Sequence, residues 1–117
     1  MPHVVIEEAV DVATASRSVV LTAARTDGEI LKVVDVFVNR AGLTALVDCV
    51  VVEDGRSQAF FVQLAQKGRQ ITVRLLPATD PEKTPGVKRV MALIAKQVQA
   101  ASAGSHFGKT NLQEFLS

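Results

Sequence analysis

The chain has 117 residues, of which 48% are apolar but only 4% aromatic, and the apolar set consists mainly of Val, Ala and Leu. Side chains of this kind favour strands over a helical bundle, and the length fits one globular domain with a sizeable core. The net charge of +1 and the single cysteine argue against a nucleic-acid binder, a disordered chain and an internal disulfide.

The N-terminal residues and the lengths of the apolar runs indicate where in the cell the protein is expected. The first residues lack a basic segment followed by a long apolar stretch, and no apolar run approaches the ~20 residues of a membrane helix. We therefore expect a cytoplasmic protein without membrane contact. With two histidines and one cysteine, we also expect no metal site and no cofactor.

A six-stranded sheet is predicted from the N-terminus onward. Alternating apolar and polar residues predict a first strand, with its register left open. Asp27-Gly28 and Asp54-Gly55 are hairpin signals, because both central residues of a type I′ turn have positive φ. The sequence predicts a twisted antiparallel meander, or half-barrel. Its strand-like segments are residues 3–12, 17–26, 29–40, 43–54, 57–66 and 69–76.

A helix is predicted after the sheet. Residues 77–83 contain two prolines, which prevent further ladder pairing and predict a linker. Thr84 followed by proline predicts a helix start, and apolar residues at helical spacing predict an amphipathic helix over 85–103. We expect an α+β domain at 1–103, with this helix on one sheet face. The tail at 104–117 could form a short helix that contacts a partner chain.

Two-residue turns determine which residues oppose each other, and so assign each side chain to a face. One face is apolar except for Lys32 and is assigned to the helix. The second face is mixed, but its apolar centre is too large to leave in water on a stable monomer. We expect a cover, which is most often a second copy in a homodimer, with the tail or a ligand as alternatives. The apolar residues of this predicted dimer face are Leu31, Val33, Phe37, Leu46 and Val50.

Two carboxylates oppose each other on the second face. The predicted register places Asp35 opposite Asp48, with Phe61 and Arg74 in the same row, although a three-residue loop at 40–42 would separate the two aspartates. Opposed like charges destabilise a strand pair, and burial increases the cost. Arginines of a second copy are the favoured explanation, with a shared proton or a Mg²⁺ or Ca²⁺ ion as alternatives. The candidate ligand or interface cluster is Asp35, Asp48, Phe61, Gln63, Thr72 and Arg74.

Other candidate motifs are weaker. Residues 104–110 look like a phosphate loop, but Ala103 replaces its first glycine and a helix is expected before it. Cys49 projects toward the predicted helix and is expected to be a small core residue rather than a nucleophile. No aromatic residues interleave with the basic residues of the helix, so we expect no nucleic-acid binding.

These patterns favour a small non-enzymatic accessory or binding protein that self-associates through the second sheet face and could also bind a catalytic partner protein. The alternative is a small-molecule binding protein or proton-transfer enzyme with its site around Asp35 and Asp48. A helix on a curved sheet is shared by lipid-binding modules, ligand-binding grip folds and accessory subunits. The shape by itself therefore does not select among these functions.

Overall fold

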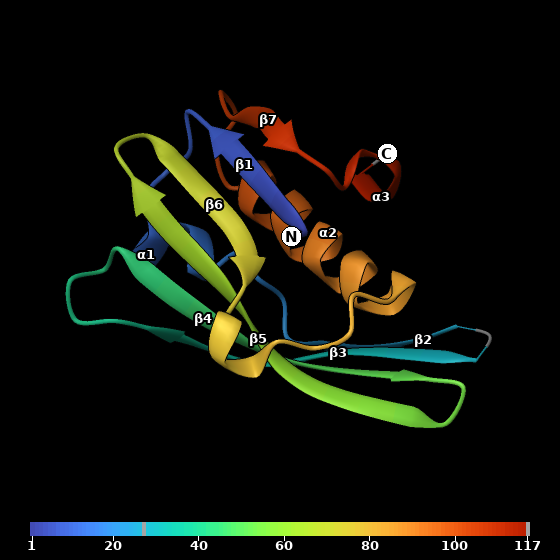
Figure 1. The fold of residues 1–117 in the computed structure, drawn as a ribbon. Coiled ribbons are helices and arrows are strands. Elements are labelled where there is room, and N and C mark those ends of the chain that lie inside the picture. The colour runs from blue at the N-terminus through green and yellow to red at the C-terminus, as the bar shows by residue number, and fades with distance from the viewer. Residues whose placement is uncertain (27, 117) are drawn as a thin grey trace.

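A curved antiparallel sheet wraps around one long helix in the computed structural model, which describes residues 1–26 and 28–116 (Figure 1). The predicted α+β class and antiparallel sheet are confirmed, but the sheet has seven strands rather than six. The strands are β1 (His3–Glu7), β2 (Thr22–Thr26), β3 (Glu29–Val38), β4 (Thr44–Glu53), β5 (Arg56–Lys67), β6 (Gln70–Leu75) and β7 (His106–Thr110). The helices are α1 (Val12–Ser16), the short 3-10 helix η1 (Pro77–Thr79), α2 (Pro85–Ala100) and α3 (Gln113–Leu116).

The strand order is β2-β3-β4-β5-β6-β1-β7, so only β2 to β6 form the predicted meander. The predicted first strand over 3–12 is too long. It ends at Glu7, because Glu8 has a φ of +53° and Asp11 then caps α1. The chain crosses the sheet through α1 before β2 begins, so β1 joins β6 at the far side instead of pairing with β2.

The C-terminal tail belongs to the same sheet. β7 pairs with β1, and a short helix, α3, follows it as predicted. Leu112 is 1% exposed in the core, and Asn111 binds the N-terminal segment through the Met1 carbonyl at 2.7 Å and the His3 N–H at 3.0 Å. The tail therefore packs on its own chain, where it adds the seventh strand.

A β-bulge in β3 changes the predicted faces. The pairing of β3 with β4 shifts register between Val33 and Asp35, so one residue is inserted on the β3 side. Leu31 and Val33 consequently point into the core, with exposures of 9% and 2%, and their predicted place on the second face is wrong. Lys32 is exposed and pairs with Val50, which removes the charged exception from the helix-covered face.

The turn between β5 and β6 also differs from the prediction. Lys67 pairs with Gln70, so the loop is Gly68-Arg69 rather than Lys67-Gly68. Gly68 has a φ of +60° and occupies the first loop position. The shift moves β6 by two residues along β5, and because the side-chain period is two, every residue of β6 keeps its predicted face.

The predicted hairpin glycines take the backbone conformation that tight turns require. Asp54 and Gly55 have φ values of +50° and +79°, which confirms the predicted turn between β4 and β5. Gly28 has a φ of +71°, and its predicted turn partner Asp27 lies outside the described residues.

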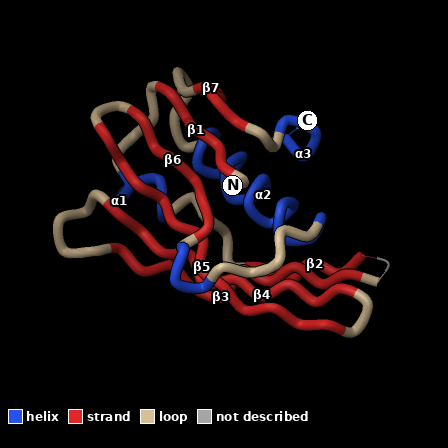
Figure 2. The backbone as a smooth tube through the Cα atoms, in the orientation of Figure 1, coloured by secondary structure: helices blue, strands red, loops and turns tan. Residues whose placement is uncertain are grey.

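Helix α2 fills the concave side of the sheet, here called the inner face, and the opposite side is the outer face (Figure 2). The Thr84 hydroxyl caps α2 at its N-terminus, as predicted, but the helix ends at Ala100 rather than at residue 103. Helix α1 also contacts α2, β3 and β4. Within the described residues, no helix is both long and apolar enough to cross a membrane.

Candidate functional site

The predicted aspartate pair exists on the outer face. Asp35 of β3 and Asp48 of β4 oppose each other directly, and Asp48 also opposes Phe61 of β5. The Asp35 side chain is exposed and accepts a hydrogen bond of 2.8 Å from the Val36 N–H, whereas Asp48 is half-buried. Among the described residues, neither carboxylate belongs to an ion pair. Within the described part of the chain, the pair therefore has no cation in ion-pair contact.

Arg74 lies outside the predicted row of the aspartates. The Gly68-Arg69 turn places it opposite Gln63 instead of Phe61, and its Nε donates to Gln63 Oε1 at 2.7 Å. Thr72 lies farther away, opposite Ala65 and Val5. The predicted cluster is thus divided: Asp35, Asp48 and Phe61 share one row, and Arg74 and Gln63 share the next.

An apolar hollow opens beside these two rows on the outer face. Phe37 is 52% exposed on this face, while Leu46 and Val50 are half-buried. Val38 pairs with the core residue Ala45, so its side chain points to the inner side. The hollow has a volume of about 280 Å³. It is lined by Phe37, Val38, Asn39, Thr44, Leu46, Gln63 and Leu76. We call Phe37 and Leu46, which oppose each other on this face, the outer patch.

The C-terminal half of β3, residues 34–38, is also an open edge of the sheet. Strand β2 pairs with β3 only over residues 29–33, so residues 34–38 have no strand partner on that side within the described part of the chain. The Asp35 carboxylate covers the Val36 N–H on this segment. A charged side chain at an apolar edge discourages uncontrolled strand pairing.

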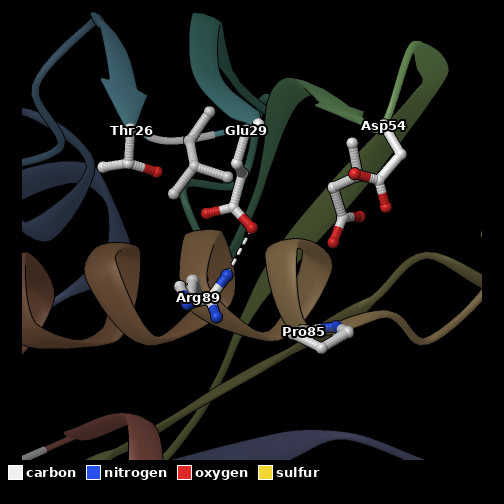
Figure 3. Close-up of a pocket in the computed structure, with 8 residues that line it drawn as sticks. Thr26, Glu29, Asp54, Pro85 and Arg89 are labelled. Atoms are coloured by element: carbon white, nitrogen blue, oxygen red, sulfur yellow. Dashed lines mark hydrogen bonds and ion pairs between the residues drawn. The ribbon is translucent and has the colours of Figure 1, made fainter.

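The largest described hollow lies elsewhere, where the tips of β3 and β4 meet the start of α2 (Figure 3). Its volume is about 590 Å³. Arg89 of α2 forms an ion pair with Glu29, whose side chain is only 10% exposed. The lining residues are Thr26, Gly28, Glu29, Leu31, Glu53, Asp54, Pro85 and Arg89.

Glu53 in this second hollow holds the N-terminus of α2. Its carboxylate accepts hydrogen bonds from the Thr84 hydroxyl and, at 3.0 Å, from the Gly86 N–H. Negative charge at a helix N-terminus is stabilising because the first N–H groups have no partner within the helix. The hollow is therefore a junction whose charged groups are largely engaged within the chain. The sequence did not predict this hollow, although it did predict the start of the helix at Thr84.

The remaining predicted candidates have structural roles. Cys49 is fully buried on the inner face, and burial, followed by the nearby Asp48 charge, raises its pKa to about 12. Residues 106–110 form β7, so most of the phosphate-loop pattern lies in a strand rather than in a loop before a helix. In the described part of the chain, no group of three His, Cys, Asp or Glu residues could hold a metal ion.

Comparisons of the chain with protein-family models, with curated proteins and with solved structures found no match. The structure itself defines a small α+β domain in which helices cover one face of a curved sheet, while on the other face no described helix covers the exposed side chain of Phe37.

Proposed function

We propose that this protein is a non-enzymatic accessory protein that self-associates through the outer face of its sheet. The observation that carries the proposal is Phe37, which is 52% exposed in the isolated chain and lies opposite Leu46 on the outer face. Removing apolar surface from water is favourable by about 25 cal/mol per Å², so a partner that covers the outer patch gains stability.

A second copy of the chain is the partner that we propose. Oligomers of soluble proteins are mostly symmetric pairs, in which the same patch occurs on both sides of the interface. The inner face cannot serve as this interface, because α1 and α2 cover it. A catalytic partner protein would then bind the surfaces that remain free in the dimer.

The proposal predicts that Phe37→Ser converts a dimer to monomers. Phe37 is half exposed in the single chain, so serine removes apolar contact area between copies without emptying the core. Light scattering coupled to size-exclusion chromatography, at micromolar concentration, should give a mass of two chains for the wild type and of one chain for the variant.

Val20→Ser is the matched control. Val20 is 57% exposed, but it precedes β2, and its N–H binds Gln97 Oε1 of α2 at 3.0 Å, away from the outer patch. This variant should keep the mass of the wild type. A wild-type protein that is strictly monomeric at micromolar concentration contradicts the proposal.

Small-molecule binding is a second candidate function, which the outer hollow favours. Its volume of about 280 Å³ is close to the lower limit of ligand pockets, roughly 300 Å³, and Thr44 and Gln63 add polar groups to its apolar lining. Neither this hollow nor the one at the start of α2 is lined by Asp35 or Asp48. A ligand site in the outer hollow needs no second copy, so the same mass measurement separates the two functions.

A further inference from the structure

The outer face carries opposite charges that its own chain leaves separate. Asp35 and Asp48 oppose each other without a cation in ion-pair contact, and Arg74 is exposed and bonded to the neutral Gln63. Among the described residues, the ion pairs include neither Arg74 nor Lys32, the other cation that faces outward beside Asp35 on β3. Both halves of a salt bridge are therefore present on one face but unpaired.

The separation of these charges explains why they stay unpaired within one chain. Gln63 opposes Arg74, and Phe61, two residues away on β5, opposes Asp48. Arg74 is thus two strands and two residues from Asp48, which corresponds to roughly 12 Å along the sheet, given strands ~4.8 Å apart and a rise of ~3.4 Å per residue. A guanidinium group does not span this distance to form a bidentate contact.

We propose that a second copy docks on the outer face so that Arg74 of each copy binds between Asp35 and Asp48 of the other. This inference rests on the proposed self-association. A two-fold axis that crosses β5 between Phe61 and Gln63 exchanges the positions of Arg74 and Asp48, so both salt bridges form at once. The charge pattern of this face is complementary to itself, and this complementarity specifies a second copy as the occupant.

Arginine suits this position chemically. Its planar guanidinium presents five N–H donors and can bind two carboxylates at the same time, whereas an ammonium group acts as a point charge. The contact also removes the repulsion between Asp35 and Asp48, which is otherwise uncompensated in the single chain. The apolar outer patch contributes to affinity, and the arginine–aspartate contacts determine the orientation of the two copies.

Complementary charge reversal tests the inference. Arg74→Asp should place a third carboxylate against Asp35 and Asp48 of the other copy, and Asp48→Arg should oppose arginine with arginine. Each variant alone should therefore dimerise at least about tenfold more weakly than the wild type. An equimolar mixture should regain a dimer that contains one chain of each variant, because both contacts are then between opposite charges. Native mass spectrometry resolves this heterodimer by its mass.

Two further variants make the experiment decisive. Lys109→Asp reverses an exposed charge on β7 and should leave dimerisation unchanged. If circular dichroism shows that Asp48→Arg does not fold, Asp35→Arg replaces it, because Asp35 is exposed. Variants that are folded and dimerise like the wild type overturn the salt-bridge inference and leave self-association standing. The same inference fails if two folded, weakened variants form no heterodimer, and a monomeric wild type overturns both proposals.

Discussion

At the scale of single residues, the sequence predicts one half of the candidate site and misplaces the other. Asp35 opposes Asp48 because β3 and β4 keep the predicted register at this end, as the bond of 2.9 Å from the Asn39 N–H to the Thr44 carbonyl shows, although the connection between the two strands is longer than the predicted two-residue turn. Arg74 is misplaced because glycine tolerates positive φ at either loop position, so Gly68 alone does not specify which residue accompanies it. Which residue accompanies Gly68 in this turn thus determines whether Arg74 lies in the row of Asp48 or in the next row.

Gly86 provides a prediction at this scale. A Cβ atom at Gly86 would lie 2.6 Å from Glu53 Cδ and 2.7 Å from Val51 Cγ1, so β4 leaves no room for it. Gly86→Ala should lower the free energy of unfolding by about 1–3 kcal/mol, as expected for overpacking, even though alanine favours helices by up to ~1 kcal/mol over glycine. Chemical denaturation monitored by circular dichroism measures this change.

Gly104→Ala is the matched control for this substitution. A Cβ atom at Gly104 meets nothing within 4 Å, so alanine fits there without displacement of a neighbour. The unfolding midpoint of this variant should equal that of the wild type. Equal midpoints for Gly86→Ala and the wild type would show that α2 moves away from β4 at little cost.

At the scale of elements, the sequence predicts which segments form strands, but it does not predict where a strand is interrupted by a bulge or where a short helix forms between strands. The bulge in β3 lies between Val33 and Asp35, where no glycine signals an inserted position. Helix α1 has five residues, too few to show helical periodicity, and most of its segment lies in the gap between the predicted strands 3–12 and 17–26. Both features depend on contacts with other elements, since α1 packs against β3 and β4 and the bulge turns Leu31 and Val33 toward the core.

The N-terminal cap of α1 leads to a pH prediction. The Asp11 carboxylate accepts a hydrogen bond of 2.7 Å from the Thr14 N–H, and this bond to the backbone lowers the pKa of Asp11 below its ordinary value of 3.8. A native pKa below the unfolded one stabilises the fold above the unfolded pKa, and this contribution is lost as the pH falls through the native pKa. Asp11→Ala should therefore be less stable than the wild type at about pH 6 and equally stable at about pH 2.

The matched variant at this position is Asp11→Asn. The asparagine side chain would still accept the Thr14 N–H bond but does not titrate, so this variant should keep most of the cap and lose its pH dependence. Urea unfolding midpoints for the three proteins across this pH range provide the measurement. A constant difference between Asp11→Ala and the wild type at every pH would contradict the assignment of this titration to Asp11.

At the scale of the whole molecule, the sheet and α2 enclose a filled core. Side chains from β4, β5, β6 and α2, including Val47, Val62, Val73 and Ile94, are 0% exposed. The described hollows are lined by residues at strand tips, loops and the outer face rather than by these core residues. Interactions with other molecules are therefore expected at the surface, which agrees with the proposed role as an interaction protein.

Cys49 reports on the opening of this core. It is the single cysteine of the chain, it is fully buried, and its raised pKa of about 12 keeps it as a thiol near neutral pH. Alkylation by iodoacetamide should be slow in the native protein and should accelerate with denaturant in parallel with global unfolding. Mass spectrometry of the alkylated chain measures the rate, and Cys49→Ala gives the background. Rapid labelling without denaturant would show that β4 opens locally.

The sequence by itself determined the α+β class, the sheet from β2 to β6, the start of α2 and the aspartate pair, because these follow from local periodicity, turn glycines and capping residues. Only the tertiary structure decided where β1 and β7 pair, that Leu31 and Val33 are buried, and that Arg74 lies apart from Asp48. Pairing between distant segments and insertions within a strand depend on packing between elements, and no short stretch of residues records that packing.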